Sequence, residues 1–200
     1  MKRGIYLIWD LPLADTVSPE EFFVALQGDY PCAVQLRAKH SRTKPPVFES
    51  LKSACRARKI MFVVNDRVDW LDPDVDGLHL GQTDGEAPTD PSLFVGRSTH
   101  QLEQVRDAAR DDRISLLGFG PIRTTQSKRN PLPPRGFELL VQAVAQAQHK
   151  PVVAIGGLTA DDLKSVHHAG AHAAAVIGAV WASPDPVEAL RSLVRCWNNL

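Results

Sequence analysis

The sequence is poor in cysteine and in aromatic residues, and each shortage argues against a class of protein. Only three cysteines occur in 200 residues, Cys32, Cys55 and Cys196, with no CxxC pair and no Cys/His ligand spacing. This pattern argues against a disulfide-stabilised scaffold and a structural zinc site, and it fits a reducing cytoplasm. Aromatic residues make up 6% of the chain, too few for a platform that stacks the bases of single-stranded nucleic acid.

Long hydrophobic runs and an excess of one charge are also missing. The 23 Lys+Arg balance the 23 Asp+Glu, whereas a protein that binds nucleic acid through its phosphates has a basic excess. No apolar run reaches the roughly 18 residues of a membrane span. The apolar segment 4–9 is too short for a signal peptide, and Asp10 follows it without a small-residue cleavage site. We therefore expect a cytoplasmic protein that binds neither nucleic acid nor membranes.

The chain does contain short apolar runs at regular intervals. Eight can be identified, at 5–9, 33–36, 60–64, 77–80, 93–96, 114–118, 152–155 and 173–177. Several are continuous and β-branched, which is typical of parallel strands buried on both faces. With 44% hydrophobic residues, a chain of this length can bury the core of one domain.

Amphipathic segments lie between most of these runs. Helical patterns cover 18–26, 48–55, 101–110, 137–148, 159–166 and 187–197. The segments 69–76 and 88–92 are too short for full helices. Strands that alternate with helices in this way predict an α/β fold with one domain over residues 1–200, a compact (β/α)8 TIM barrel. An open doubly wound sheet is the alternative, but segment 10–13 lacks the glycine fingerprint that follows the first strand of such a sheet.

Chemistry in such a barrel takes place at the carboxyl ends of the strands. The second predicted strand ends in Gln35, Arg37 and Lys39, which strand alternation puts on one side. An amide, a planar guanidinium and a point charge together suit a polyanion such as a diphosphate. A charged strand end at the surface is the alternative explanation.

Acidic residues follow the third and fourth predicted strands. Asp66 comes directly after Asn65, and Asp84 lies shortly after the next strand. Two carboxylates from adjacent strand ends match a hydrated Mg²⁺ that completes its shell with phosphate oxygens, and the motif offers no soft ligands for zinc. Asp66 could instead cap a short helix, and Asp84 could be a turn residue. His79, inside the fourth strand, is expected to pack rather than to bind metal.

The fifth and sixth strands lead into further polar segments. The segment Ser98-Thr99-His100 could cap the next helix, and His100 could act as an acid or base. After the sixth strand, a long polar loop with several prolines covers 120–136, and long loops in compact domains are usually lids or binding loops. The hydroxyls of Thr125 and Ser127 lie there beside Lys128, an arrangement that suits phosphate.

Glycines follow the last two strands, where backbone N–H groups can approach an anion at a helix start. Gly156-Gly157 comes after strand seven and Gly178 after strand eight, the common phosphate-binding corner of this fold. The barrel mouth is thus predicted to hold two anionic regions, one assisted by metal and one lined by backbone. Two phosphorylated reactants held side by side are the simplest explanation.

Taken together, nine segments resemble the thiamine-phosphate synthase family, in the family's order and over nearly the whole chain. They are YLI-D at 6–10, QLRAK at 35–39, VNDRVD at 64–69, DGLHLGQTD at 76–84, GRSTH at 96–100, GFGPI at 118–122, TQSK at 125–128, VVAIGG at 152–157 and AVIGA at 175–179. The combination of QLR-K, NDR and HLGQ-D is highly specific, whereas AIGG alone is common to many barrels.

The resemblance implies a transferase reaction on small-molecule substrates. A hydroxymethylpyrimidine diphosphate would ionise with loss of pyrophosphate, and the nitrogen of a thiazole phosphate, plain or carboxylated, would attack the carbocation to give thiamine phosphate. By position, Mg²⁺ would be held by Asp66 and Asp84, and the catalytic residues would be Lys39, Ser98 and Lys128. The pyrimidine diphosphate would be bound by Gln35, Leu36, Arg37, Ala38, Lys39, Asn65, Ser98 and Lys128. The thiazole phosphate would be bound by Thr125, Gln126, Ser127, Gly157, Ile177 and Gly178.

The chain also departs from the family pattern. Ala38 stands where an acidic residue is usual, Gly178 where Ser is frequent, and Arg123-Thr124 where an aromatic–Pro pair is common, while Trp9 replaces a smaller residue. Arg123 and Trp9 bear on substrate fit and rate more than on reaction type. A related barrel, the thiazole tautomerase, has a GRS-H segment whose His works in acid/base chemistry, so an isomerase that uses His100 is one alternative. A non-catalytic barrel that binds thiamine precursors is another, and a homo-oligomer is left open.

Overall fold

The computed structural model describes residues 1–125 and 132–200, and there eight parallel strands close into a barrel. The strands are β1 (Gly4–Asp10), β2 (Ala33–Arg37), β3 (Met61–Asn65), β4 (Gly77–Leu80), β5 (Phe94–Thr99), β6 (Leu116–Phe119), β7 (Val152–Ile155) and β8 (Ala173–Val176). Each strand pairs with the next along the chain, and β8 pairs with β1. The predicted TIM barrel is confirmed, with every predicted strand present.

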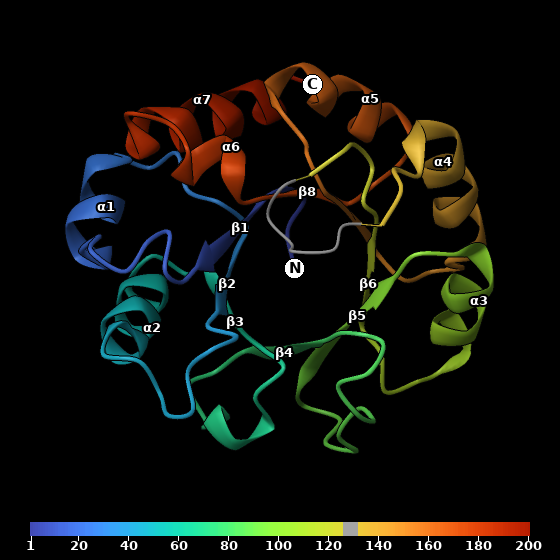
Figure 1. The fold of residues 1–200 in the computed structure, drawn as a ribbon, viewed down its shortest axis with the longest axis horizontal. Coiled ribbons are helices and arrows are strands. Elements are labelled where there is room, and N and C mark those ends of the chain that lie inside the picture. The colour runs from blue at the N-terminus through green and yellow to red at the C-terminus, as the bar shows by residue number, and fades with distance from the viewer. Residues whose placement is uncertain (126–131) are drawn as a thin grey trace.

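Helices form a ring outside the barrel (Figure 1). They are α1 (Pro19–Ala25), α2 (Val47–Ala57), α3 (Leu102–Arg110), α4 (Gly136–Gln146), α5 (Leu163–His168), α6 (Gly178–Trp181) and α7 (Pro186–Asn198), with 3-10 turns η1 (Val68–Trp70) and η2 (Ala160–Asp162). The expectation of no full helix in 69–76 and 88–92 is confirmed, whereas the four-residue α6 was not predicted. No helix of the described ranges is long and apolar enough to cross a membrane.

The main core fills the space between the barrel and the helices. Trp9 is fully buried there, with its ring 4.9 Å from Trp181 and 5.4 Å from Phe22. Such edge-on aromatic contacts add to the free energy gained by burying the rings. Trp9 therefore faces the helix layer, away from the inside of the barrel, which removes the expectation that it shapes substrate fit directly.

A second, smaller core fills the inside of the barrel. It is built from side chains on alternate positions of the strands, among them Tyr6, Ile8, Val63, Leu116 and Val153. Alternation puts these residues on the inner face of their strands and their sequence neighbours on the outer face. Nearer the carboxyl ends the inner face becomes polar, and the candidate site begins at this change of character.

Candidate active site

A buried chain of hydrogen bonds forms the floor of the candidate site. The Tyr6 hydroxyl donates to Gln35 Oε1 at 2.9 Å, and Gln35 Nε2 donates to Asn65 Oδ1 at 2.6 Å. Burial raises the pKa of Tyr6 far above its usual range, so this hydroxyl remains a donor at any physiological pH. The structure thus brings Gln35 and Asn65, two predicted binding residues, into direct contact, and these hydrogen bonds orient both amides.

Arg37 at the end of β2 is held by an acid that the sequence reasoning did not place in the site. Arg37 Nη1 lies 2.6 Å from Asp10 Oδ1, and Asp10 is only 5% exposed. Burial raises the pKa of Asp10, while the Arg37 charge and hydrogen bond oppose that rise. The signal for Asp10 was present, since an acid ends the otherwise apolar first strand at the level of Arg37. This pairing orients the guanidinium at the barrel mouth.

Two residues of the same segment face the other way. The side chains of Leu36 and Ala38 are buried in the main core, between the barrel and the helices. Strand alternation explains this, because Gln35 and Arg37 occupy the opposite face. These two side chains therefore do not reach the inside of the barrel, and substrate binding by Leu36 and Ala38 stays a prediction that only their backbone atoms could fulfil.

The two predicted metal ligands lie close together, with a lysine beside them. Asp66 and Asp84 approach near enough to share a hydrogen bond, and Lys39 Nζ lies 3.7 Å from Asp66 Oδ2. Asp66 has a left-handed backbone with φ of 62°, and Asp84 Oδ2 accepts a hydrogen bond from Gly81 N at 2.8 Å. Asp84 therefore also stabilises the turn in which it lies, as the alternative interpretation expected. Asp66 does not cap the following 3-10 turn η1, because the N-cap of η1 is Arg67.

The charges at this pair have one clear electrostatic consequence. Burial and the neighbouring Asp84 carboxylate raise the pKa of Asp66 to about 6. The pKa of Asp84 is lowered, because hydrogen bonds from the Asp66 carboxyl and the Gly81 N–H outweigh its burial. The pair therefore keeps one proton to a higher pH than an isolated aspartate would, as expected where two carboxylates share a site.

This donor set fits Mg²⁺. Asp66 and Asp84 offer hard carboxylate oxygens, and Mg²⁺ is commonly bound through one or two carboxylates while water and phosphate oxygens fill its other positions. The described part of the chain holds no group of three or more His, Cys, Asp or Glu residues that could enclose a metal ion. A site completed by the substrate matches this geometry better than a closed protein cage.

His79 lies inside the barrel and also makes a hydrogen bond to a predicted site residue. His79 Nε2 lies 2.9 Å from Ser98 Oγ inside the barrel, and the His79 carbonyl accepts a hydrogen bond from Asp66 N at 2.9 Å. Glycines on β5 and β6 make room for the ring, because a Cβ at Gly96 would lie 2.5 Å from His79 Nδ1 and one at Gly118 3.2 Å from Cε1. Gly96 lies opposite His79 in the strand register, and a glycine within the fifth predicted strand was the sequence signal for this space.

The glycine turn after β7 lies against the loop that follows β6. Gly156 and Gly157 have φ of 103° and 66°, and a Cβ at Gly157 would come 2.2 Å from the Thr124 carbonyl oxygen. Only glycine fits this combination of backbone angle and close approach. On the adjacent strand, β8 leads through Ile177 into Gly178, the first residue of α6, so both predicted glycine segments lie side by side at the carboxyl ends of paired strands.

The remaining predicted residues are only partly placed. Thr125 lies at the end of the described part of its loop, whereas Gln126, Ser127 and Lys128 lie outside the described residues. The catalytic and binding roles of those three stay predictions. His100 lies at the end of β5, where its Nδ1–H donates to the Gly120 carbonyl at 2.6 Å. That bond determines which ring nitrogen carries the proton in the neutral imidazole.

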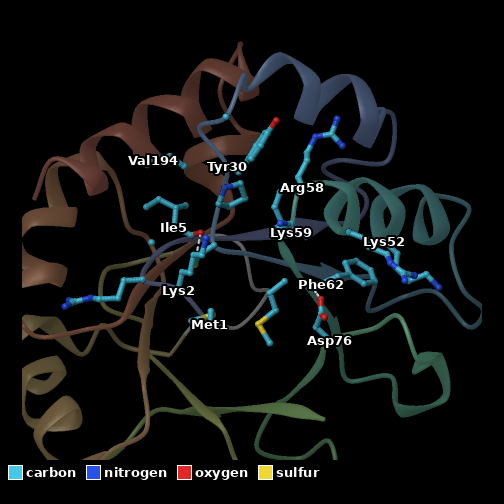
Figure 2. Close-up of a pocket in the computed structure, with 18 of the residues that line it drawn as sticks. Met1, Lys2, Ile5, Tyr30, Lys52, Arg58, Lys59, Phe62, Asp76 and Val194 are labelled. Atoms are coloured by element: carbon cyan, nitrogen blue, oxygen red, sulfur yellow. Dashed lines mark hydrogen bonds between the residues drawn. The ribbon is translucent and has the colours of Figure 1, made fainter. Parts of the chain in front are cut away.

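A cavity of about 1060 Å³ lies elsewhere, at the amino ends of the strands (Figure 2). Met1, Ile5, Tyr30, Lys59 and Asp76 are among its lining residues, and none of the predicted site residues is. Two of its cations are already paired with carboxylates, through the Arg58–Glu20 and Lys52–Asp72 ion pairs. Because catalysis in this fold takes place at the opposite end, we assign the candidate active site to the carboxyl mouth despite the size of this cavity.

Comparison with known proteins agrees with the geometry of the carboxyl mouth. Residues 5–180 match the family model described as thiamine monophosphate synthase. The chain belongs to this family. A family member from Roseiflexus castenholzii, named thiamine-phosphate synthase, is 39% identical over 202 residues, which cover 96% of this chain and 87% of that protein. One from Anaeromyxobacter dehalogenans is 41% identical over 162 residues, which cover 77% of this chain and 72% of that protein.

A solved structure within the family has the same fold. A thiamine phosphate pyrophosphorylase from Pyrococcus furiosus superimposes with a TM-score of 0.84 at 30% identity, covering 98% of this chain and 96% of that one. Some relatives are much longer. A thiamine-phosphate synthase from Synechococcus sp. strain CC9605 is 41% identical over 172 residues, which cover 81% of this chain and 47% of that protein. The chain thus spans about half the length of several curated relatives that it matches.

Proposed function

We propose that this family member is a thiamine-phosphate synthase. It joins a hydroxymethylpyrimidine diphosphate to a hydroxyethylthiazole phosphate, or to the carboxylated thiazole, and releases pyrophosphate. The observation that carries the proposal is the meeting of Asp66, Asp84 and Lys39 at the carboxyl mouth, because two carboxylates and a cation suit a diphosphate that arrives with a divalent metal. Membership of the family supports the same reaction.

Asp66 and Asp84 would hold Mg²⁺ in this proposal, and the bound ion supplies positive charge to the phosphate oxygens. Lys39, with a side chain 45% exposed, reaches the same place from the end of β2. Arg37, held by Asp10, offers its guanidinium to the phosphates as a planar donor. These groups would orient the diphosphate so that its bond to the pyrimidine carbon lies at the barrel mouth.

Negative charge grows on the pyrophosphate as that carbon–oxygen bond breaks. Lys39, and Lys128 as predicted from the sequence, would stabilise this charge more strongly in the transition state than in the ground state. Removing one such group typically costs about 3–4 kcal/mol of barrier. The thiazole nitrogen attacks with its own lone pair, so no general base has to activate it.

The other placed residues would bind and orient the reactants. Gln35, Asn65 and Ser98 present fixed polar groups inside the barrel, toward which the pyrimidine would point. The glycine turn at Gly157 and the start of α6 would accept the thiazole phosphate. Holding both partners in line removes much of the entropic cost of their encounter.

The test is incubation of the purified protein with both substrates, with Mg²⁺ or with EDTA. Thiamine phosphate is measured as fluorescent thiochrome, and pyrophosphate is measured separately. We expect product only with Mg²⁺, loss of product in Asp66→Asn, and normal product in His100→Ala. Product that persists in EDTA would contradict the metal assignment. No condensation, combined with isomerisation of a thiazole carboxylate phosphate that His100→Ala abolishes, would favour the tautomerase alternative. Binding of the precursors without pyrophosphate release would favour the non-catalytic one.

The proposed setting follows from the same chemistry. All three cysteines are free thiols, which fits a reducing compartment, and we place the activity in the cytoplasm. Its partners in this proposal are the two small phosphorylated substrates.

A further inference from the structure

Asp162 joins two of the loops at the carboxyl end of the barrel. Its Oδ1 accepts hydrogen bonds from Arg123 Nε at 3.0 Å and Nη2 at 2.9 Å, and Arg123 lies in the loop after β6. Its Oδ2 accepts from the backbone N–H of Thr159 at 3.1 Å and from the Thr159 hydroxyl at 3.2 Å, in the turn after β7. The Asp162 side chain is only 8% exposed, so both of its oxygens are committed to these protein partners.

This link lies beside the glycine turn. The backbone N–H of Arg123 donates to the Gly156 carbonyl at 2.9 Å. A Cβ at Gly157 would lie 2.8 Å from Arg123 Cβ, in addition to its clash with the Thr124 carbonyl. The loop after β6 and the turn after β7 are therefore in direct backbone contact where Arg123 crosses between them.

A third element supports the same guanidinium. Arg123 Cζ lies 4.9 Å from the centre of the Phe137 ring, near the start of α4. The Arg123 side chain is 55% exposed, and its charge is balanced by Asp162. A guanidinium already paired with a carboxylate is a weak choice for direct binding of a phosphate. A planar group that donates two hydrogen bonds to one carboxylate and packs on a ring is well suited to hold loops in place.

We propose that Arg123 and Asp162 are positioning residues for the thiazole phosphate. They hold residues 122–124 against Gly156-Gly157, so that the backbone around Gly157 and the start of the loop at Thr125 keep one arrangement before the substrate arrives. This inference rests on the proposed function. Preorganisation of one subsite predicts an effect mainly on one substrate, because Arg37, Lys39 and the Asp66–Asp84 pair, proposed to hold the diphosphate, lie on or just after β2–β4, across the barrel from β6 and β7.

Arg123→Met and Arg123→Lys test this directly. Methionine keeps an apolar contact with Phe137 but loses the charge and both hydrogen bonds, whereas lysine keeps the charge. We expect Arg123→Met to raise KM for the thiazole phosphate on the order of 10- to 100-fold. KM for the pyrimidine diphosphate should stay unchanged, and Arg123→Lys should fall between. Arg106→Met is the matched control, because Arg106 makes one exposed hydrogen bond, to Gln146 between α3 and α4, away from the site.

Amide hydrogen exchange gives a readout that does not depend on activity. Arg123→Met should speed exchange in 121–125 and 156–159 while the melting temperature and the exchange of β1–β4 stay near those of the unmodified protein. Equal increases in the KM values of both substrates would overturn the positioning role. An unchanged KM for the thiazole phosphate, or unchanged exchange in 121–125 and 156–159, would overturn it as well. If the unmodified protein forms no thiamine phosphate, the proposed function fails, and exchange still decides whether Arg123 orders the two loops.

Discussion

Replacement of Asp66 by Asn should stabilise the metal-free protein while it abolishes the proposed activity. The Asp66 carboxyl is 21% exposed and lies beside the Asp84 carboxylate, which together raise its pKa from 3.8 to about 6. Because the folded pKa is above the unfolded one, the ionised carboxylate opposes folding at neutral pH. Asn removes that charge, and it tolerates the left-handed backbone at this position well.

The size of the effect follows from the pKa. A tenfold change in proton affinity corresponds to about 1.4 kcal/mol, so the rise gives an upper bound of about 3 kcal/mol at pH 7.5. Lys39, whose Nζ lies 3.7 Å from Asp66 Oδ2, favours the ionised form of Asp66. The variant loses this attraction, which reduces its gain in stability. Solvent at the site screens the repulsion from Asp84 as well. We therefore expect the free energy of unfolding to rise by about 1–2 kcal/mol.

Urea unfolding at several pH values in EDTA measures this difference. The advantage of Asp66→Asn should be full above pH 7, shrink as the pH falls through about 6 and the folded carboxyl takes up its proton, and vanish only below the unfolded pKa of 3.8, at about pH 3. Millimolar Mg²⁺ should stabilise the unmodified protein and leave the variant unchanged. Asp112→Asn, at an exposed turn before β6, is the control and should show none of these changes. A variant that is no more stable at pH 7.5, or whose full advantage persists at about pH 3, would refute the reasoning.

Three further substitutions test the placed residues. His79→Ala removes the partner of Ser98 and should lower kcat/KM about tenfold with little change in melting temperature, whereas unaltered steady-state kinetics would contradict a role for that bond. Gly157→Ala forces a Cβ against the Thr124 carbonyl and should lower the free energy of unfolding by about 1–3 kcal/mol in urea titrations; a neutral result would contradict the observed contact. Asp10→Asn frees Arg37 and should raise KM for the pyrimidine diphosphate alone, and a shift confined to the thiazole phosphate would count against this pairing.

The barrel could be predicted because its strands are coded locally. Continuous β-branched runs such as 60–64 and 152–155 are long enough to show a buried parallel strand, and capped amphipathic segments fill most of the intervals. The helix α6 was missed because four residues, Gly178–Trp181, show no helical period at all. Any helix of a single turn is too short to show a helical period in its sequence.

The site was harder to predict than the fold, because its partners come from different strands. Asp66 and Asp84 stand out as polar residues after apolar runs, and their proximity follows from the adjacency of β3 and β4. The Asp10–Arg37 and His79–Ser98 contacts depend instead on which face each side chain takes and on its level in the barrel. Strand parity alone would have placed Trp9 outside and Asp10 inside, since neighbouring residues of a strand face opposite ways.

Tyr6 has a consequence that reaches beyond its own position. Its hydroxyl, deep below the mouth, requires an acceptor and so dictates which end of the Gln35 amide points down. The amide nitrogen of Gln35 then donates to Asn65 Oδ1. Tyr6 therefore determines, from the layer below, where the floor of the mouth presents a donor and where an acceptor. A Phe at position 6 would keep the shape of the barrel and leave that amide free to turn over, exchanging donor for acceptor without any change in the residues that touch substrate. Ligand preference in such a barrel can therefore change through substitutions in the layer below the site.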